Sequence, residues 1–184
     1  MRWSWIDRII ELSPGQRLVA IKHIGLGDDA VQEHFSQDDG LGLDHPVMPG
    51  ALIIEGMAQT AGVLVGHAKG FKEKVVLAKI SKAELTREAT PGSTLRFTAT
   101  IDRIDAMGAA TSGVVELINP KPCEESDNTN TNHPASNVEV IGHIDLIFSH
   151  IDNNYAGAAF PEHNFVFSDS FRTLLRISGL KANF

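Results

Sequence analysis

The sequence predicts an α+β fold in which one long apolar helix lies against one face of an antiparallel sheet. The first observation is a run of mostly apolar or small residues over positions 46–69. The run is too long for a strand, and its Ala, Leu and Met residues favour a helix. The second observation is that one strand-like segment precedes the run and four follow it. A helix that is apolar on nearly all sides belongs inside a protein, so we expect the sheet to cover it.

The strand predictions rest on alternating apolar and polar residues, with turn residues between the segments. Residues 17–25 alternate before the helix, and the later segments are 75–86, 94–104, 109–118 and 138–151. Edges left open on such a sheet invite pairing with a second subunit.

Chain length and local composition predict one domain with an insert and an extension. A chain of 184 residues fits a single domain, which we place at 1–151, and residues 119–137 form a polar loop inserted in it. Residues 152–184 are expected to form a C-terminal extension that packs on the domain, because disordered tails rarely carry so many phenylalanines. Within it, residues 168–180 read as a capped amphipathic helix. Residues 3–10 read only as a short apolar segment leading into a turn.

Composition excludes several classes of protein. The net charge of −7 argues against nucleic-acid binding. The N-terminus lacks the uninterrupted apolar core of a signal peptide, and two polar residues, Glu55 and Gln59, interrupt the best candidate membrane span. The single cysteine, Cys123, rules out an internal disulfide and fits a reducing compartment. We therefore expect a cytoplasmic protein without a membrane insertion.

Two polar residues in the helix are the first candidates for a site. Glu55 and Gln59 are four positions apart, so they share one helix face. A carboxyl group in an apolar wall is either held by a structural partner or kept dry for proton transfer, and residue type leaves both readings open. Gln59 either holds Glu55 or a water near it, or packs in the helix core.

Basic residues gather just after the helix, whereas residues 122–171 contain no Lys or Arg. Such a cluster is either a rim that steers an acidic partner or an ordinary solvated face. The cluster consists of Lys69, Lys72, Lys74, Lys79, Lys82 and Arg87.

Three stretches carry a family resemblance: IDRIIELSPGQRLVAIKHI, then QEHF, then PVMPGALIIEGMAQTAG. Together they resemble the 3-hydroxyacyl-[acyl-carrier-protein] dehydratases of fatty-acid synthesis. The chain is more similar to the FabZ branch than to the FabA branch, because Glu55 stands where the latter has Asp. The resemblance covers residues 5–118 and resumes weakly at 142–149. HF alone carries no information, but HF followed by PxMPGxLxxExMAQ is specific.

The resemblance implies a hot-dog fold, in which a curved antiparallel sheet wraps a central helix. It implies a homodimer, or a higher oligomer built from dimers, with sites at the subunit interface. The implied reaction is dehydration of a 3-hydroxyacyl thioester, carried by acyl carrier protein or CoA, to the trans-2-enoyl thioester. This chemistry needs no cofactor and no metal, and no HExxH zinc signature is present.

The resemblance also implies roles for individual residues. The catalytic histidine falls on His34, and the catalytic acid falls on Glu55, donated by the partner chain. The backbone N–H that polarises the thioester carbonyl falls on Gly50. A histidine suits removal of the α-proton, a carboxyl can protonate the leaving hydroxyl, and a helix N-terminus stabilises charge on the carbonyl oxygen. The remaining substrate-binding residues are expected to be Ala51, Leu52, Met57 and Gln59.

The chain departs from the family pattern around the catalytic histidine. The family usually has glycine before that histidine, whereas this chain has Glu33. The loop at 36–45 is longer and acidic, and it makes His45 a rival for the catalytic role. We favour His34, because the phenylalanine that follows it also matches.

Two other functions are compatible with the sequence. The first is an acyl thioesterase, because hot-dog folds also host that chemistry; release of free thiol would identify it. The second is a non-catalytic acyl-binding subunit, to which Glu33 and the long loop give some weight; tight binding without turnover would identify it.

Overall fold

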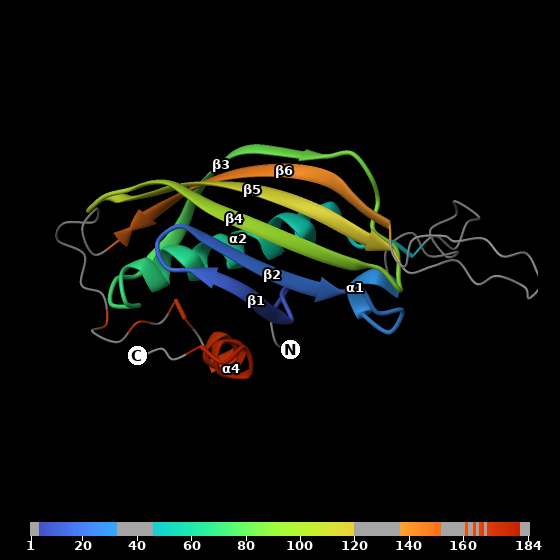
Figure 1. The fold of residues 1–184 in the computed structure, drawn as a ribbon, viewed down its shortest axis with the longest axis horizontal. Helices are drawn as coiled ribbons and strands as arrows, with labels where there is room; N and C mark the ends of the chain where they lie inside the picture. The colour runs from blue at the N-terminus through green and yellow to red at the C-terminus, as the bar shows by residue number, and fades with distance from the viewer. Residues whose placement is uncertain are drawn as a thin grey trace, which may run out of the picture.

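The computed structural model describes residues 4–32, 46–119, 137–151, 161, 164, 166–167 and 169–180. Among them are six strands and three helices, which keep the labels of Figure 1. The strands are β1 (Arg8–Ser13), β2 (Arg17–His23), β3 (Val75–Leu85), β4 (Thr94–Ile104), β5 (Gly108–Asn119) and β6 (Asn137–His150). The helices are α1 (Asp29–Gln32), α2 (Gly50–Ala68) and α4 (Asp169–Ile177).

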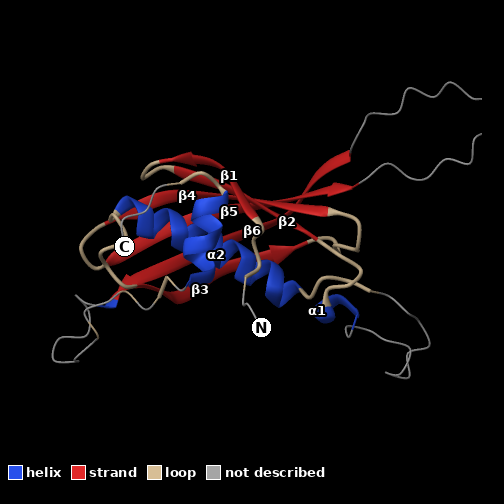
Figure 2. Ribbon diagram, turned by 90° about the horizontal axis from the view of Figure 1, so that it is seen from below, coloured by secondary structure: helices blue, strands red, loops and turns tan. Residues whose placement is uncertain are grey.

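All six strands form one sheet in the order β1-β2-β4-β5-β6-β3, and every neighbouring pair is antiparallel. The sheet curves over α2 (Figure 1), and the view from below shows α2 running along the concave face (Figure 2). The predicted α+β class and the hot-dog arrangement are therefore confirmed. β3 comes directly after α2 but lies at the far edge of the sheet, beside the last strand.

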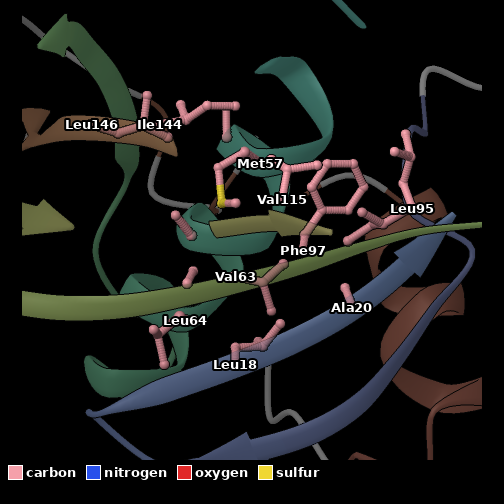
Figure 3. Close-up of a cluster of buried hydrophobic side chains, with 14 of the residues drawn as sticks. Leu18, Ala20, Met57, Val63, Leu64, Leu95, Phe97, Val115, Ile144 and Leu146 are labelled. Carbon is pink, nitrogen blue, oxygen red and sulfur yellow. The ribbon is translucent and has the colours of Figure 1, made fainter. Parts of the chain in front are cut away.

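The core lies between α2 and the concave face of the sheet. Met57 and Leu64 of α2 are fully buried, as are Phe97 of β4 and Val115 of β5 (Figure 3). Burying one such side chain contributes about 1.5–3 kcal/mol. Gly56 allows the close approach, because a Cβ placed on it would lie 2.6 Å from the tip of the Phe97 ring. By length and composition α2 would pass for a membrane span, yet 61% of an 18-residue stretch of it is buried inside the protein, as in the core helix of a soluble protein.

The strand β1 differs from the sequence prediction, which took residues 3–10 only as an apolar segment. β1 pairs with β2, and its register shifts between Ile9 and Glu11. Such a bulge places two successive residues opposite one partner and interrupts the alternation of faces. The period-2 signal that identifies a strand is therefore missing from this part of the sequence.

The C-terminal helix α4 packs beside β1, as Figure 1 shows. Its Leu174 and Leu175 are buried, and the Ser178 hydroxyl oxygen accepts a hydrogen bond of 3.0 Å from the Ile9 N–H. Gly179 follows the helix with a φ of 76°, a conformation that suits glycine at a helix end. The division of the chain into a domain at 1–151 and an extension at 152–184 stays a prediction, and most of the insert at 119–137 lies outside the described residues.

Candidate functional site

The first part of the site is the start of α2. Pro49 precedes the helix in an extended conformation (φ −56°, ψ 133°), and no side chain caps this end. The Pro49 carbonyl oxygen accepts hydrogen bonds from the N–H groups of Leu52 and Ile53. Gly50 and Ala51, at the helix tip, are exposed. The first N–H groups of a helix have no partner within it and carry partial positive charge, so this end can bind an oxygen that becomes negative.

A hollow of about 490 Å³ opens at this helix start. Met48, Gly50 and Ile53 line one side of it, and the end of β3 with the three following residues lines the other. A small polar group that entered the hollow would therefore reach the backbone of the first helical turn.

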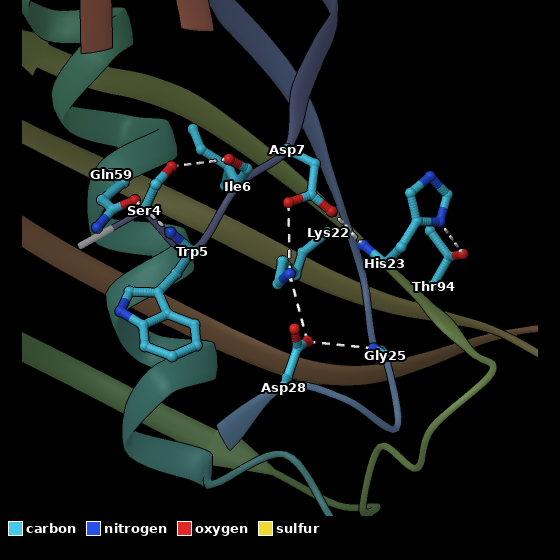
Figure 4. Close-up of polar contacts among 10 residues, drawn as sticks. All are labelled: Ser4, Trp5, Ile6, Asp7, Lys22, His23, Gly25, Asp28, Gln59 and Thr94. Carbon is cyan, nitrogen blue, oxygen red and sulfur yellow. Dashed lines mark hydrogen bonds and ion pairs between the residues drawn. The ribbon is translucent and has the colours of Figure 1, made fainter. Parts of the chain in front are cut away.

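The second part of the site is the Glu55 carboxyl group, which is held in place by Gln59. The Gln59 Nε2 donates a hydrogen bond of 2.8 Å to Glu55 Oε1. The Gln59 Oε1 accepts a hydrogen bond of 2.8 Å from the Trp5 backbone N–H (Figure 4). A backbone N–H can only donate, so this bond fixes the carbamoyl oxygen toward Trp5 and the NH₂ group toward Glu55. The structure thus shows the contact with Glu55, and the Gln59 side chain is also buried.

The N-terminal segment that carries Trp5 is itself anchored to β2. The Lys22 ammonium lies 3.3 Å from Asp7 Oδ1 and 3.5 Å from Asp28 Oδ2 (Figure 4). The other Asp7 oxygen accepts a 2.7 Å hydrogen bond from the His23 N–H. Because Lys22 is largely buried, these pairs are screened less than fully exposed ones. The anchoring keeps the Trp5 N–H aimed at Gln59.

The third part of the site is an apolar pocket of about 280 Å³ that begins at Glu55. It follows the α2 face that carries positions 55, 58, 59 and 62, the spacing of one side of a helix. At 1.5 Å per residue, positions 55 and 62 lie about 10 Å apart along the axis. Apart from Glu55 and Gln59 the walls are apolar or glycine; they are formed by Ala58, Gly62, Val63, Val75, Val76, Leu77, Phe148, Val166, Phe167 and Phe171.

The hollow and the pocket lie on different sides of α2. Glu55 follows Gly50 by five residues, and at 3.6 residues per turn the two positions are rotated by about 140° around the axis. The hollow and the pocket share no lining residue. A single copy of the chain therefore does not aim the helix start and the Glu55 carboxyl at the same small group.

Of the other expected site residues, the structure describes Leu52 and Met57 but not His34. Leu52 is half-buried against the core, whereas Met57 is fully buried. The Met57 sulfur lies 2.5 Å from where a Cβ on Gly113 of β5 would be. His34, together with Glu33 and the loop at 36–45, lies outside the described residues. The catalytic and substrate-binding assignments made from the sequence stay predictions.

Several pocket residues were not singled out from the sequence. Ala58 and Gly62 stand three and seven positions after Glu55, and these small residues on the carboxyl face were a usable signal. Phe148 and Phe171 come from distant parts of the chain. Their phenylalanine character alone gave no indication of where they would lie.

The basic residues after α2 differ in exposure and in their partners. Lys74 is buried. Lys69, Lys82 and Arg87 each lie within 4.0 Å of a carboxylate oxygen. Lys72 and Lys79 are exposed. Among the residues that the structure describes, no cluster of three or more His, Cys, Asp or Glu side chains is arranged to hold a metal ion.

In its sequence, the chain is similar to proteins of a known family. Residues 2–117 match the model of the FabA-like domain. The chain is 37% identical over 113 residues to the 3-hydroxyacyl-[acyl-carrier-protein] dehydratase FabZ of Caldanaerobacter subterraneus subsp. tengcongensis, which covers 61% of this chain and 75% of the relative. It is 31% identical over 123 residues to the protein of the same name from Ruminiclostridium cellulolyticum, covering 66% of this chain and 81% of the relative.

Solved structures are similar in fold. The dehydratase heterocomplex ApeI:P from Xenorhabdus doucetiae has a TM-score of 0.54 at 20% identity, over 83% of this chain and 86% of that one. AziG from S. sahachiroi has a TM-score of 0.52 at 14% identity, over 78% and 89% of the two chains. An acyl-CoA hydrolase from Staphylococcus aureus has a TM-score of 0.51 at 12% identity, over 75% and 67%. Because the matched domain model spans more than half of the sequence, the chain belongs to the FabA-like family.

Proposed function

We propose that this protein is a lyase that dehydrates 3-hydroxyacyl thioesters, carried by acyl carrier protein, to trans-2-enoyl thioesters in fatty-acid biosynthesis. Membership of the FabA-like family and relatives named as FabZ dehydratases support this function. The observation that carries it is the Glu55 carboxyl, held by Gln59 at the mouth of an apolar pocket on the helix whose start is uncapped.

The imidazole, the helix start and the carboxyl group each have one role in the proposed reaction. His34 takes the proton from the carbon next to the thioester carbonyl, and the electrons of that C–H bond form the new double bond. The N–H groups at Gly50 stabilise the negative charge that grows on the carbonyl oxygen. Glu55 protonates the hydroxyl group as the C–O bond breaks, so that it leaves as water. Each proton-transfer group contributes about 10²–10⁴ in rate.

The site is proposed to be completed across a homodimer. The rotation of about 140° between Gly50 and Glu55 favours a carboxyl supplied by a second subunit. The edge strand β3 offers the contact, because it is eleven residues long and most of its side chains are exposed, Leu77 and Ile80 among them. An exposed edge with apolar side chains is a template for pairing with another chain. Dimers paired in this way can associate further into a larger homo-oligomer.

The exposed lysines Lys72 and Lys79 lie on the segment that follows α2, near the proposed interface. Their charge favours the approach of an acidic carrier protein from solution. The acidic net charge, the single cysteine and the buried state of the apolar helix fit work in the cytoplasm.

The test is turnover of a 3-hydroxyacyl-carrier thioester, followed by the absorbance of the enoyl product. We expect His34→Ala and Glu55→Gln each to lose about 10²–10⁴ in kcat/KM, with the oligomeric state unchanged in size-exclusion chromatography. Glu11→Gln, which removes an exposed carboxylate on β1, is the control and should keep full activity. Undiminished turnover in either site variant would refute the assignment.

The same assay separates the two alternative functions. A thioesterase would release free thiol from the substrate without forming the enoyl absorbance. A non-catalytic acyl-binding protein would bind the thioester and form neither product. Enoyl formation without thiol release is the result that we expect.

A further inference from the structure

We propose that Phe171, on the C-terminal helix α4, closes the acyl pocket and sets the longest acyl chain that the enzyme accepts. The inference rests on the proposed dehydratase function and goes beyond it, because it assigns a specificity-determining role to a residue outside the matched domain, which ends at residue 117. The pocket is the one of about 280 Å³ that begins at Glu55.

The shape and polarity of the pocket fit an acyl tail. Its polar lining residues, Glu55 and Gln59, are successive on one helix face and mark one end. From there the small residues Ala58 and Gly62 line a trough along α2, and Phe148 lies beside Gly62 in the same lining. A Cβ on Gly62 would lie 3.5 Å from the Phe148 ring, an ordinary contact distance. A substrate with its reacting carbons at the carboxyl and its methylenes beyond matches this order of groups.

The far end of the trough is closed by aromatic rings from the C-terminal extension. Phe167 packs against Gly66 of α2, where a Cβ would lie 2.4 Å from the ring. The Phe167 ring meets Phe71 edge-on, with centroids 5.0 Å apart, and meets Phe171 edge-on at 6.0 Å. Phe167 and Phe71 are buried, whereas Phe171 is half-buried and lines the pocket. Gly66 lies about 16 Å along the helix axis from Glu55, at 1.5 Å per residue.

This end wall is fixed to the body of the protein. The Asn164 side-chain NH₂ donates hydrogen bonds of 2.9 Å to the Phe71 carbonyl and 3.0 Å to the Glu73 carbonyl. Its carbonyl oxygen accepts a bond of 3.2 Å from the Val166 N–H. The bonds tie the segment just before Phe167 to the turn that follows α2. A tethered wall resists displacement by a long acyl tail, so the ring of Phe171 limits the length of the chain.

Phe171→Ala removes the ring and leaves the buried Phe167 in place, so the variant should extend the pocket. Each further methylene that becomes buried adds about fourfold in kcat/KM, the factor that corresponds to about 0.8 kcal/mol per buried CH₂. Gly62→Ala places a methyl group in the trough and should have the opposite effect, lowering turnover of the longest accepted substrate. Ile177→Ala is the matched control, because Ile177 lies on the same helix but is 54% exposed.

The experiment measures kcat/KM for a series of 3-hydroxyacyl thioesters of increasing length with wild type and each variant. We expect Phe171→Ala to shift the preferred length upward, and Ile177→Ala to leave the whole profile unchanged. Phe171→Leu, which keeps an apolar contact, should give a smaller shift in the same direction and serves if the alanine variant does not fold.

The possible outcomes distinguish the role of Phe171 from the dehydratase function itself. An unchanged length profile in both folded Phe171 variants overturns the role of Phe171 and leaves the dehydratase function standing. If wild type dehydrates no substrate of any length, the proposed function itself fails.

Discussion

The contact between Gln59 and Glu55 predicts that Gln59→Glu will destabilise the protein in a pH-dependent way. The substitution keeps the oxygen that accepts the Trp5 N–H and replaces the donor to Glu55 with a second carboxylate oxygen. The donor and acceptor are 2.8 Å apart in the wild type, so the variant brings two carboxyl groups into contact. A hydrogen bond to a charged group contributes about 1.5–3 kcal/mol, and we expect a loss of about 2 kcal/mol at pH 7.

The sign of the pH dependence follows from proton sharing. Two carboxyl groups in contact share a proton, so the folded variant binds more protons near neutral pH than the unfolded chain. Stability then falls as pH rises, and the difference from wild type should shrink as pH is lowered from 7 to about 5, with a slope of up to about 1.4 kcal/mol per pH unit.

Thermal unfolding followed by circular dichroism at both pH values is the assay. A protein of this size loses about 2–4 °C in Tm per kcal/mol, so the variant should melt about 4–8 °C below wild type at pH 7. The double variant Glu55→Gln with Gln59→Glu exchanges donor and acceptor and should recover most of the loss. Equal Tm values for Gln59→Glu and wild type at pH 7, or an equal deficit at both pH values, would refute the reasoning.

Two further predictions concern the sheet. Arg96 donates hydrogen bonds of 2.7 and 2.5 Å to the two Glu116 oxygens, and this pairing holds the pKa of Glu116 below its ordinary value. A lowered pKa in the folded state contributes stability that is lost as pH falls through that pKa. In urea unfolding, Glu116→Gln should therefore lower the free energy of unfolding by about 1 kcal/mol at pH 7 and by almost nothing near pH 3. An equal loss at both pH values would contradict the pairing. Gly108→Ala should cost about 1–3 kcal/mol, because the new Cβ would lie 2.1 Å from the Phe148 carbonyl oxygen; an unchanged urea midpoint would show that the strands separate freely there.

Much of the fold was predictable because its helix and strands leave periodic patterns of apolar residues in the sequence. The apolar run at 46–69 became α2 (Gly50–Ala68), and every strand after it lies where alternation placed it. The contact between Glu55 and Gln59 also follows from local spacing, since residues four apart on a helix are neighbours.

The parts of the site that were missed depend on long-range packing. Trp5 and Gln59 are separated by 54 positions, and only the fold brings that backbone N–H to the side-chain oxygen. The pocket wall joins α2 to Phe148 and Phe171, and no spacing rule connects residues so far apart. Conversely, Met57 has a residue type suited to an acyl pocket, but its side chain faces the sheet and is fully buried. Direction around the helix depends on which face the sheet covers, and a helix that is apolar on all sides does not reveal that face.

The C-terminal helix has a consequence for how far assembly can proceed. A sheet with both edges free can add copies at each side without end and grow into a filament. Here the Ser178 hydroxyl takes the Ile9 N–H of β1, and α4 lies beside that strand. Of the two edge strands that the structure describes, β1 is therefore obstructed and β3 is the one left open to pairing. If the proposed homodimer pairs through β3, sheet extension would stop at two chains, because neither copy would then have a second open edge among the described strands.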